Sequence, residues 1–312
     1  MTGFDYSDDN KRYHTLYYHN KHTYGKRVIK AVIDAGFTCP NIDGTKGTGG
    51  CIFCDGGSGY FTAGSTVPIA GQIEREKERI GKKYPDALIT AYFQAHTNTY
   101  ADTQVLAEKF LEAVNCGVHS LAIATRADCI DAQKADMLAG LGVPVTMELG
   151  LQTIHDETAA RMNRCHTYAE FLTAYRLLKE HGLRVCVHLI NGLPGETCEM
   201  MYETAREVGK LRPDGVKLHL LHIIKGTRLC EMYENGLYEP MTKDEYIETV
   251  VHQLEYLPPE TVIERITGDG DKRTLVAPLW SIDKISVLGG IDKRMTELDI
   301  CQGDKYTSED IP

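Results

Sequence analysis

Residues 28–54 read VIKAVIDAGFTCPNIDGTKGTGGCIFC, and this stretch decides the fold. The run from Val28 to Phe37 is apolar and β-branched, which predicts a buried strand. A glycine-rich loop follows and holds Cys39, Cys51 and Cys54 at the spacing C-x11-C-x2-C. In folds built from parallel strands, the loops after the carboxyl ends of the strands form the active site. This loop is therefore the first candidate site.

The same alternation of a short apolar run and an amphipathic stretch recurs along the chain. Further strands are expected near Leu88–Gln94, Ser120–Thr125, Val145–Leu151, Arg184–Ile190 and Gly215–Leu221. Helices are expected near Gly71–Lys83, Asp102–Asn115, Ile130–Leu141, Thr167–His181, Cys198–Leu211 and Lys243–Tyr256. The rhythm is that of successive βα units, which predicts an α/β protein with a parallel sheet. We expect a partial (β/α)6 TIM-like barrel with a short C-terminal extension; a full barrel and a doubly wound open sheet are the alternatives.

The pattern changes at both ends of this core. We expect a basic, aromatic-rich N-terminal extension over residues 1–27, the barrel core over 28–257, and a C-terminal extension over 258–312 that packs on the barrel. Pro258 and Pro259 break the last helix, and Thr261–Thr267 then reads as one more strand. The turn Gly268-Asp269-Gly270 and an apolar stretch around Trp280 follow, and the last dozen residues are polar and expected to fray.

Composition excludes several classes of protein. The chain has 312 residues, 34 Lys plus Arg against 44 Asp plus Glu, and a formal net charge of −10. No apolar run approaches the roughly 20 residues of a membrane helix, and the first residues carry no secretory signal, so we expect a cytoplasmic protein that does not act at a membrane. The ten cysteines are then expected to be mostly reduced. The acidic balance argues against nonspecific coating of nucleic acid, although it leaves room for a local basic surface.

The three-cysteine loop has the chemistry of a metal centre. Three thiolates can hold three irons of a cubane cluster and leave the fourth iron open to a substrate or cofactor. The glycines allow the backbone to wrap closely around such a group. Three other readings compete: a zinc site with a fourth ligand from elsewhere, a redox pair of Cys51 and Cys54, and unligated buried cysteines.

At these residues the sequence resembles the radical S-adenosylmethionine (SAM) enzymes. Phe53 fits, since an aromatic residue before the last cysteine is typical of that superfamily and packs near the adenine. The long first spacing departs from the common C-x3-C-x2-C form and is similar to the YhcC/YtqA type, which is related to the elongator catalytic subunit. The run DAGFTCPN at residues 34–41, the Gly49-Gly50-Cys51 junction and the Gly268-Asp269 turn are close to that type. The resemblance covers nearly the whole chain.

The resemblance implies the cofactors and the reaction class. Cys39, Cys51 and Cys54 would bind a [4Fe–4S] cluster, and the reduced cluster would cleave SAM to give a 5′-deoxyadenosyl radical. A reductase, flavodoxin or ferredoxin would donate the electron. By position, Gln94, Thr97 or Asn98 would hold the amino group of the cofactor, while Gln152 and Arg164 would bind its ribose and carboxylate.

Other strand ends supply further candidates. The segment from His188 to Gly195 resembles the Gly-x-x-Gly element whose backbone packs along the adenine, here with Gly192, and His188 stands where some relatives contact the ribose. The backbone at Leu221 would meet the adenine edge. Glu148 is costly to bury unpaired, so it should face the cavity and meet a hydroxyl or a cation, close to the chemistry. Cys165 stands where elongator relatives usually have glycine, and a role in quenching or donating to the radical is open to it. The same role is open to Cys198, and most of the remaining cysteines are expected to pack as small apolar residues.

The substrate is less certain than the reaction class. Residues 10–33 contain no acidic residue, and tyrosines and histidines are interleaved with the cations. Such a stretch can contact phosphates and stack on bases. The candidate tRNA contacts are Lys11, Arg12, Tyr13, Lys21, Lys26 and Arg27. Modification of the wobble uridine of tRNA, of the carboxymethylaminomethyl type, is the leading hypothesis. The alternatives are a small metabolite or peptide as substrate, with the basic stretch as a solvated cap on the barrel, and a nonenzymatic iron–sulfur or zinc sensor module.

Overall fold

The fold is a curled parallel sheet wrapped on its outer side by helices. The computed structural model describes residues 3–55, 64–94, 96–268 and 270–307. All seven strands of the main sheet are parallel, in the order β1-β2-β3-β4-β5-β6-β8. Their bounds are β1 Val28–Ile33, β2 Leu88–Phe93, β3 Ser120–Thr125, β4 Val145–Gln152, β5 Arg184–Asn191, β6 Gly215–Leu220 and β8 Val262–Arg265. The strand order follows the chain order without reversal, so the partial barrel is confirmed and the doubly wound alternative is wrong.

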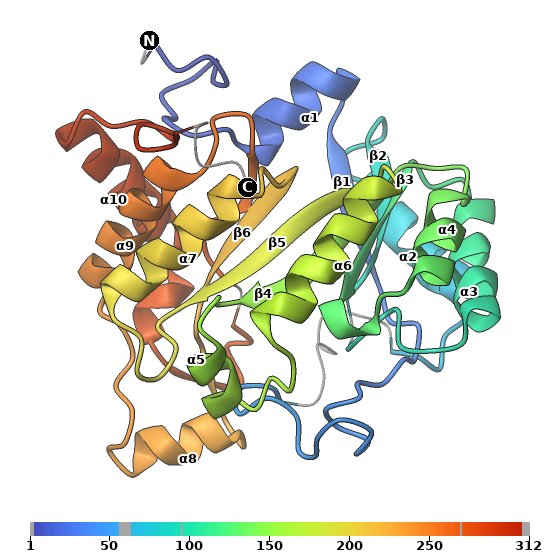
Figure 1. Ribbon diagram of the computed structural model, residues 1–312. Coiled ribbons are helices and arrows are strands. Elements are labelled where there is room, and N and C mark those ends of the chain that lie inside the picture. The colour runs from blue at the N-terminus through green and yellow to red at the C-terminus, as the bar shows by residue number, and fades with distance from the viewer. Residues whose placement is uncertain (1–2, 56–63, 95, 269, 308–312) are drawn as a thin grey trace.

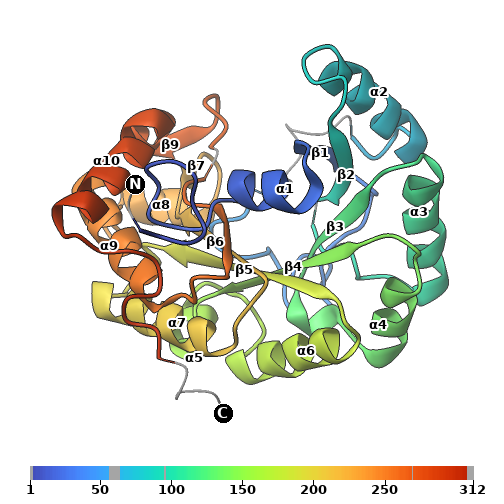
Figure 2. The same cartoon turned by 90° about the horizontal axis from the view of Figure 1, so that it is seen from above.

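The helices lie between successive strands and cover the convex face of the sheet (Figures 1 and 2). Those that follow the predicted rhythm are α2 Ile69–Gly81, α3 Thr103–Asn115, α4 Ala132–Ala139, α6 Tyr168–Glu180, α7 Cys198–Lys210 and α9 Lys243–Tyr256. Side-chain caps fix the first turns of α4, α6 and α9: Thr167 and Thr242 each form a capping box, and Asp131 accepts the Lys134 N–H. Gly117 and Gly182 follow the ends of α3 and α6 with φ of +71°, the left-handed conformation that commonly ends a helix.

The two faces of the sheet differ in chemistry. The convex face packs aliphatic and aromatic side chains against the helices; Phe93 and Phe110, for example, are fully buried and meet edge to face with ring centroids 5.0 Å apart. On the concave face, charged side chains from strands far apart in the sheet meet: Lys30 from β1, Glu148 from β4 and Lys217 from β6. Polar side chains inside the curl are the first sign that the concave face serves a ligand.

The C-terminal residues add a layer over the end of the sheet. Strand β7, Ile223–Ile224, pairs in antiparallel fashion with β9, Leu275–Ala277, and α8, Arg228–Glu234, follows β7. A short 3-10 helix, Leu279–Ile282, leads into α10, Lys284–Glu297, which packs against α9. The Trp280 ring is tilted by 44° to that of Tyr246, with the ring centroids 5.6 Å apart, and its indole N–H donates to the Met241 carbonyl at 3.1 Å. Asp269 of the expected turn, Ala95 and the end of the polar tail lie outside the described residues.

Three features differ from the sequence-based expectations. The first strand ends at Ile33 rather than Phe37, because the backbone from Asp34 turns away and is held by Gln72 of α2. A helix that was not expected, α1 Leu16–Tyr24, lies within the N-terminal extension. Three other helices without a sequence prediction, α5 Asp156–Arg161, α8 and α10, follow β4, β7 and the 3-10 helix.

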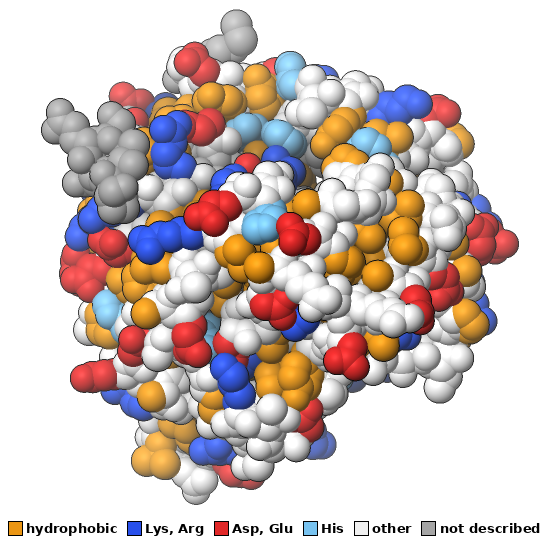
Figure 3. All heavy atoms as spheres, turned by 45° about the vertical axis from the view of Figure 1, so that its right-hand side comes forward, with side chains coloured by type: hydrophobic (Ala, Val, Ile, Leu, Met, Phe, Trp, Pro, Cys, Tyr) orange, Lys and Arg blue, Asp and Glu red, His pale blue; other side chains and the backbone are white. Residues whose placement is uncertain are grey.

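Charge is distributed without a dominant surface on the face drawn in Figure 3. Acidic and basic side chains are interspersed there, with apolar side chains between them. Within the described residues, no helix is long and apolar enough to cross a membrane.

Candidate functional site

The three-cysteine loop follows the carboxyl end of β1 and is shaped by its own backbone. Ile42 N donates to Cys39 O at 2.8 Å, and Gly50 N donates to Asn41 O at 2.8 Å, so the chain folds back on itself between the first and second cysteines. Cys54 N donates to Cys51 O at 3.0 Å, which closes the C-x-x-C segment into one turn. The sequence spacing therefore becomes a compact loop.

Two asparagines dock this loop onto the connection between α5 and α6. Asn41 is fully buried, and its amide donates to the Asn163 carbonyl. Asn163 in turn donates to Thr48 O at 3.1 Å and to Gly50 O at 2.7 Å. Ile52 N donates to Met162 O at 3.1 Å. This reciprocal set fixes the loop against a rigid part of the barrel.

All three cysteine side chains line one cavity of about 200 Å³. Cys51 is buried, Cys39 is partly exposed and Cys54 is exposed. Among the described residues, no three His, Cys, Asp or Glu side chains have the spacing of a single-ion site. A cubane differs from a single ion, because its three thiolates bind separate irons and do not converge on one point. A cavity ringed by three cysteine side chains at one end of the barrel fits a [4Fe–4S] cluster.

A second cavity of about 320 Å³ adjoins the first along the carboxyl ends of the strands. The two share four lining residues, Phe53, Cys54, Gln152 and His188. The second cavity also has an apolar wall of Ile190 and Leu221. SAM anchored at a cluster in the smaller cavity would extend past Phe53 into the larger one. The two adjoining cavities therefore fit a cluster and SAM side by side.

Gln152 and Arg164 lie together at the boundary between the compartments. Arg164 donates to Gly150 O at 2.5 Å, and its other terminal nitrogen lies 3.7 Å from Cys51 Sγ. Gln152 adopts φ of +75°, an uncommon conformation for a residue with a side chain. Arg164 Nε and Gln152 Oε1 are buried and have no hydrogen-bond partner among the described residues. Such orphaned groups are costly, so they indicate a polar ligand that binds here.

The three candidates after β2 are placed differently. Gln94 lines the larger cavity, and the buried Thr97 lines the cluster cavity. Asn98 lies outside both linings; its amide donates to Phe93 O at 3.2 Å and Ala124 O at 2.9 Å. These two hydrogen bonds tie the loop to β2 and β3, so Gln94 and Thr97 are better placed than Asn98 to contact a cofactor.

Glu148 lines the cluster cavity and forms the centre of a buried charge network. Its carboxylate pairs with Lys30 at 2.6 Å and with Lys217, and His188 Nε2 lies 2.9 Å from it. Lys30 also reaches Glu264 at 3.0 Å. Burial alone would raise the pKa of Glu148, but the two ammonium groups and His188 hold it well below its usual value. Glu148 is therefore ionised, and it meets two cations.

The histidine beside this network is neutral. Burial and the charge of Lys217 lower the pKa of His188 to about 4. His219, from β6, lies with its ring centroid 5.1 Å from that of His188, and burial lowers its pKa well below the usual value. Both rings line the larger cavity as uncharged hydrogen-bonding groups.

Gly192, Leu221 and Cys165 complete the set of candidates. Leu221 lines the larger cavity, and its N–H donates to Asn191 O at 3.0 Å. Gly192 has φ of +85°, and its carbonyl accepts from the Tyr238 hydroxyl at 2.6 Å; it lies behind the lining. Cys165 has φ of +56°, a conformation that glycine adopts at lower cost, and its sulfur abuts Gly47 of the cysteine loop. It is not among the lining residues of either cavity.

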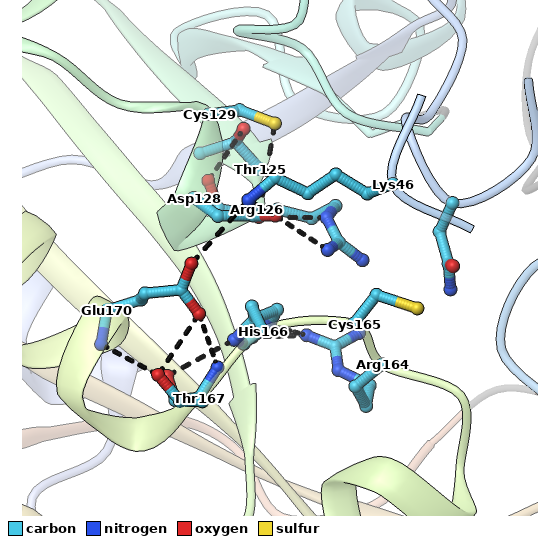
Figure 4. A network of polar contacts seen from close by, with 12 residues as sticks. Lys46, Thr125, Arg126, Asp128, Cys129, Arg164, Cys165, His166, Thr167 and Glu170 are labelled. Atoms are coloured by element: carbon cyan, nitrogen blue, oxygen red, sulfur yellow. Dashed lines mark hydrogen bonds and ion pairs between the residues drawn. The ribbon is translucent and has the colours of Figure 1, made fainter. Parts of the chain in front are cut away.

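Sequence reasoning missed several cavity residues. Arg126, at the end of β3, lines the cluster cavity, and His222 and Arg265 line the larger one. Figure 4 shows Arg126 held by Asp128, with Arg164 and Cys165 nearby. Arg126 directly follows a predicted strand. Because active-site residues of barrel folds lie just after the carboxyl ends of strands, this position could have identified it from the sequence.

The basic N-terminal segment lies at the opposite end of the barrel. It precedes β1, and the helix α1 lies over the amino ends of the strands, whereas α5 and α8 mark the carboxyl ends (Figure 1). Lys11 pairs with Asp292, Arg12 with Asp299 at 2.9 Å and Lys21 with Asp8. The remaining candidates are a buried Tyr13, an exposed Lys26, and Arg27, which stacks on Tyr17 and Tyr84. The segment is thus continuous with the cluster strand but distant from the cluster loop.

Comparison with known proteins agrees with this geometry. The family described as Radical SAM superfamily matches residues 41–208, and the Radical_SAM C-terminal domain matches residues 213–297. The chain is 44% identical to the protein YtqA of Bacillus subtilis over 96% of this chain and 94% of that one. It is 32% identical to the tRNA uridine(34) acetyltransferase of Methanocaldococcus jannaschii, over 60% of this chain and 35% of that one. Among solved structures, the archaeal Elp3 of Methanocaldococcus infernus has the same fold, with a TM-score of 0.68 and 20% identity over 89% of this chain and 64% of that chain.

Proposed function

Because this chain belongs to the radical SAM superfamily, whose enzymes use a [4Fe–4S] cluster and SAM, we propose that it modifies the side chain of the wobble uridine of tRNA, in a reaction of the carboxymethylaminomethyl-uridine type. The observation that carries the proposal is the similarity to the tRNA uridine(34) acetyltransferase over 190 residues. This chain spans about a third of that relative, so the shared part is the radical SAM region and the acetyl transfer named for the relative is not carried over.

When bound, the cluster and SAM supply a one-electron reductive cleavage that generates a 5′-deoxyadenosyl radical. The chain's own residues hold and orient these groups. Cys39, Cys51 and Cys54 ligate the cluster, and Arg164 and Gln152 offer their unpartnered buried groups to the carboxylate and ribose of SAM. An arginine fork suits a carboxylate because it can donate two parallel hydrogen bonds.

The walls of the larger cavity control what reaches the radical. Phe53, Ile190 and Leu221 provide an apolar surface that excludes water beside the cofactor. His188 and His219 present neutral rings, so they can donate or accept hydrogen bonds without placing a charge next to the reacting carbon. Glu148 carries its charge in a network with Lys30 and Lys217, which holds the concave face rigid behind the cofactor.

Exposed cations around the mouth of the larger cavity support an RNA substrate. Lys225 N donates to the carbonyl of Thr274, a lining residue, at 2.8 Å, and Lys272 lies in the turn before Thr274. Arg228 is the first residue of α8, where the helix dipole disfavours a cation, so its charge does not stabilise the helix. Lys225, Arg228 and Lys272 are exposed, and none of them forms an ion pair with another residue in the described part of the chain. They could contact phosphates while a nucleoside enters the cavity.

Mass spectrometry of tRNA nucleosides from a deletion strain tests the proposed substrate. We expect a changed wobble-uridine profile that a plasmid copy restores and that a Cys51→Ala copy does not. An unchanged profile would remove the proposal.

Binding measurements with purified tRNA test the contact surface. Lys225→Glu, Arg228→Glu and Lys272→Glu together should weaken binding and reduce the slope of log affinity against log salt by about 2. The matched set at the other end of the barrel, Lys11→Ala, Arg12→Ala, Lys26→Ala and Arg27→Ala, tests the contact expected from sequence. A loss confined to the second set would place the RNA at the amino end instead.

A small metabolite or peptide is the second candidate substrate. The favouring observation is that Lys11, Arg12 and Lys21 are already paired with aspartates, far from the cavity. Production of 5′-deoxyadenosine without any change in tRNA nucleosides would support this candidate. A protein that holds iron and sulfide but never cleaves SAM would instead be a sensor module. A reductase, flavodoxin or ferredoxin is the proposed electron donor in either enzymatic case.

A further inference from the structure

A buried arginine outside the predicted ligand set faces the cysteines. Arg126 directly follows β3 and is 5% exposed. Its Nε and Nη2 donate to the two oxygens of Asp128 at 2.9 and 2.8 Å. This two-pronged contact fixes the plane of the guanidinium, because both hydrogen bonds must be kept together.

The same carboxylate is held from the cysteine loop. Lys46, which lies between Cys39 and Cys51 in the sequence, reaches Asp128 at 2.9 Å and Glu170 of α6 at 3.6 Å. Burial opposes ionisation of Asp128, but its contacts with Arg126 and Lys46 lower its pKa. Figure 4 shows this chain of contacts from Lys46 through Asp128 to Arg126. The position of Arg126 is therefore coupled to that of the loop.

The third nitrogen of the guanidinium has nothing to donate to. Arg126 Nη1 is buried, and it has no hydrogen-bond partner among the described residues. Arg126 lines the same cavity as Cys39, Cys51 and Cys54, and the pKa of the guanidinium is raised, against the effect of burial, by Asp128 and by the sulfurs of Cys39 and Cys51. A buried cationic donor without an acceptor is costly, so an anionic acceptor is expected in this cavity.

We propose that Arg126 Nη1 donates a hydrogen bond to a sulfur of the [4Fe–4S] cluster and favours the reduced state of that cluster. A cubane with three thiolates gains one negative charge when it accepts an electron. A buried positive charge beside it stabilises the more negative state, and hydrogen bonds to cluster sulfurs act in the same direction. The inference rests on the cofactor and is independent of the tRNA substrate.

An EPR-monitored redox titration of the reconstituted protein without SAM tests this contact, with dithionite as reductant. Arg126→Gln should lower the equilibrium constant for reduction about tenfold, which is about 59 mV for a one-electron couple. Arg126→Lys, which keeps the charge, should retain most of the potential. The matched control is Lys134→Gln, which removes a cation from the neighbouring α4 that pairs with Asp131 and lies outside the cavity lining; its potential should equal that of the wild type.

The carboxylate of SAM is a second anion that could accept from the same nitrogen, and the dissociation constant for SAM separates the two. A lower potential with unchanged SAM affinity supports the contact with the cluster. An unchanged potential overturns it, whether SAM binding weakens or not. Iron and sulfide contents are measured for each protein. If Arg126→Gln holds no cluster, Arg126→Met, which also removes the charge and the Nη1 donor, takes its place and should lower the potential by a similar amount; an Arg126→Met potential equal to the wild type would equally overturn the proposal.

Discussion

Replacing Glu148 with glutamine should destabilise the barrel strongly, because that carboxylate is the common partner of two buried cations. The Glu148 side chain is fully buried, Lys217 is 4% exposed and Lys30 is 28% exposed. After the substitution Lys30 keeps its ion pair with Glu264, whereas the Lys217 ammonium keeps the Tyr92 hydroxyl at 3.5 Å and the Tyr92 ring. Removing one partner of a buried ion pair costs about 3–5 kcal/mol. For a chain of 312 residues that corresponds to a fall of about 5–8 °C in Tm.

Thermal and urea unfolding followed by circular dichroism, on protein without cluster, measure this loss. The double variant Glu148→Gln/Lys217→Met removes both charges and should recover at least half of the lost stability. Glu74→Gln, which breaks an exposed pair with Lys77, is the control and should cost less than about 1 kcal/mol. If Glu148→Gln unfolds within about 1 kcal/mol of the wild type, the interpretation of Glu148 as the centre of the network is refuted.

Three further substitutions or conditions test other parts of the structure. Asn41→Ala removes a fully buried amide that docks the cysteine loop, so urea unfolding should show a loss of about 1–3 kcal/mol, and a value near zero would contradict the docking role. Cys165 has φ of +56°, so Cys165→Gly should change stability by less than about 1 kcal/mol while Cys165→Val should lose more than that; equal effects would argue against backbone strain there. Burial lowers the pKa values of His188 and His222 to about 4 in the folded protein, so the unfolded chain binds more protons between pH 4 and 6.5. The free energy of unfolding should therefore fall as pH drops through that range, which urea midpoints measured against pH will show. A flat profile would mean that the two rings are not buried in their neutral form.

The regular part of the fold could be predicted from sequence because each βα unit repeats one apolar pattern. The helix α1 escaped prediction because none of its residues is buried, so it has no apolar stripe to detect. Its boundaries were nevertheless readable: Thr15 caps its start by accepting from Tyr18 N at 3.0 Å, and Gly25 ends it at φ of +64°. The helix α10 carried a clearer signal, since Val287, Ile291 and Met295 are buried at helical spacing.

Site residues could be predicted from the sequence only where they lie at, or just after, the end of a single strand. Cys39, Gln94, Gln152 and Leu221 all follow or end strands, and the structure brings them to the same end of the barrel. The partners of Glu148 could not be inferred, because Lys30 and Lys217 come from strands on either side of β4 that meet it only when the sheet curls. The same curl separates the basic N-terminal segment from the cluster loop, although a single strand joins them in sequence.

Formation of 5′-deoxyadenosine is the most direct test of the central claim that Cys39, Cys51 and Cys54 support radical SAM chemistry. Protein reconstituted anaerobically with iron and sulfide is reduced with dithionite in the presence of SAM, and the product is quantified by mass spectrometry. We predict that the wild type holds about four irons per chain and forms 5′-deoxyadenosine. The Cys39→Ala/Cys51→Ala/Cys54→Ala protein should form none while it keeps the thermal stability of the cluster-free wild type. Equal product from the two proteins, or a wild type that binds no iron, would contradict the account.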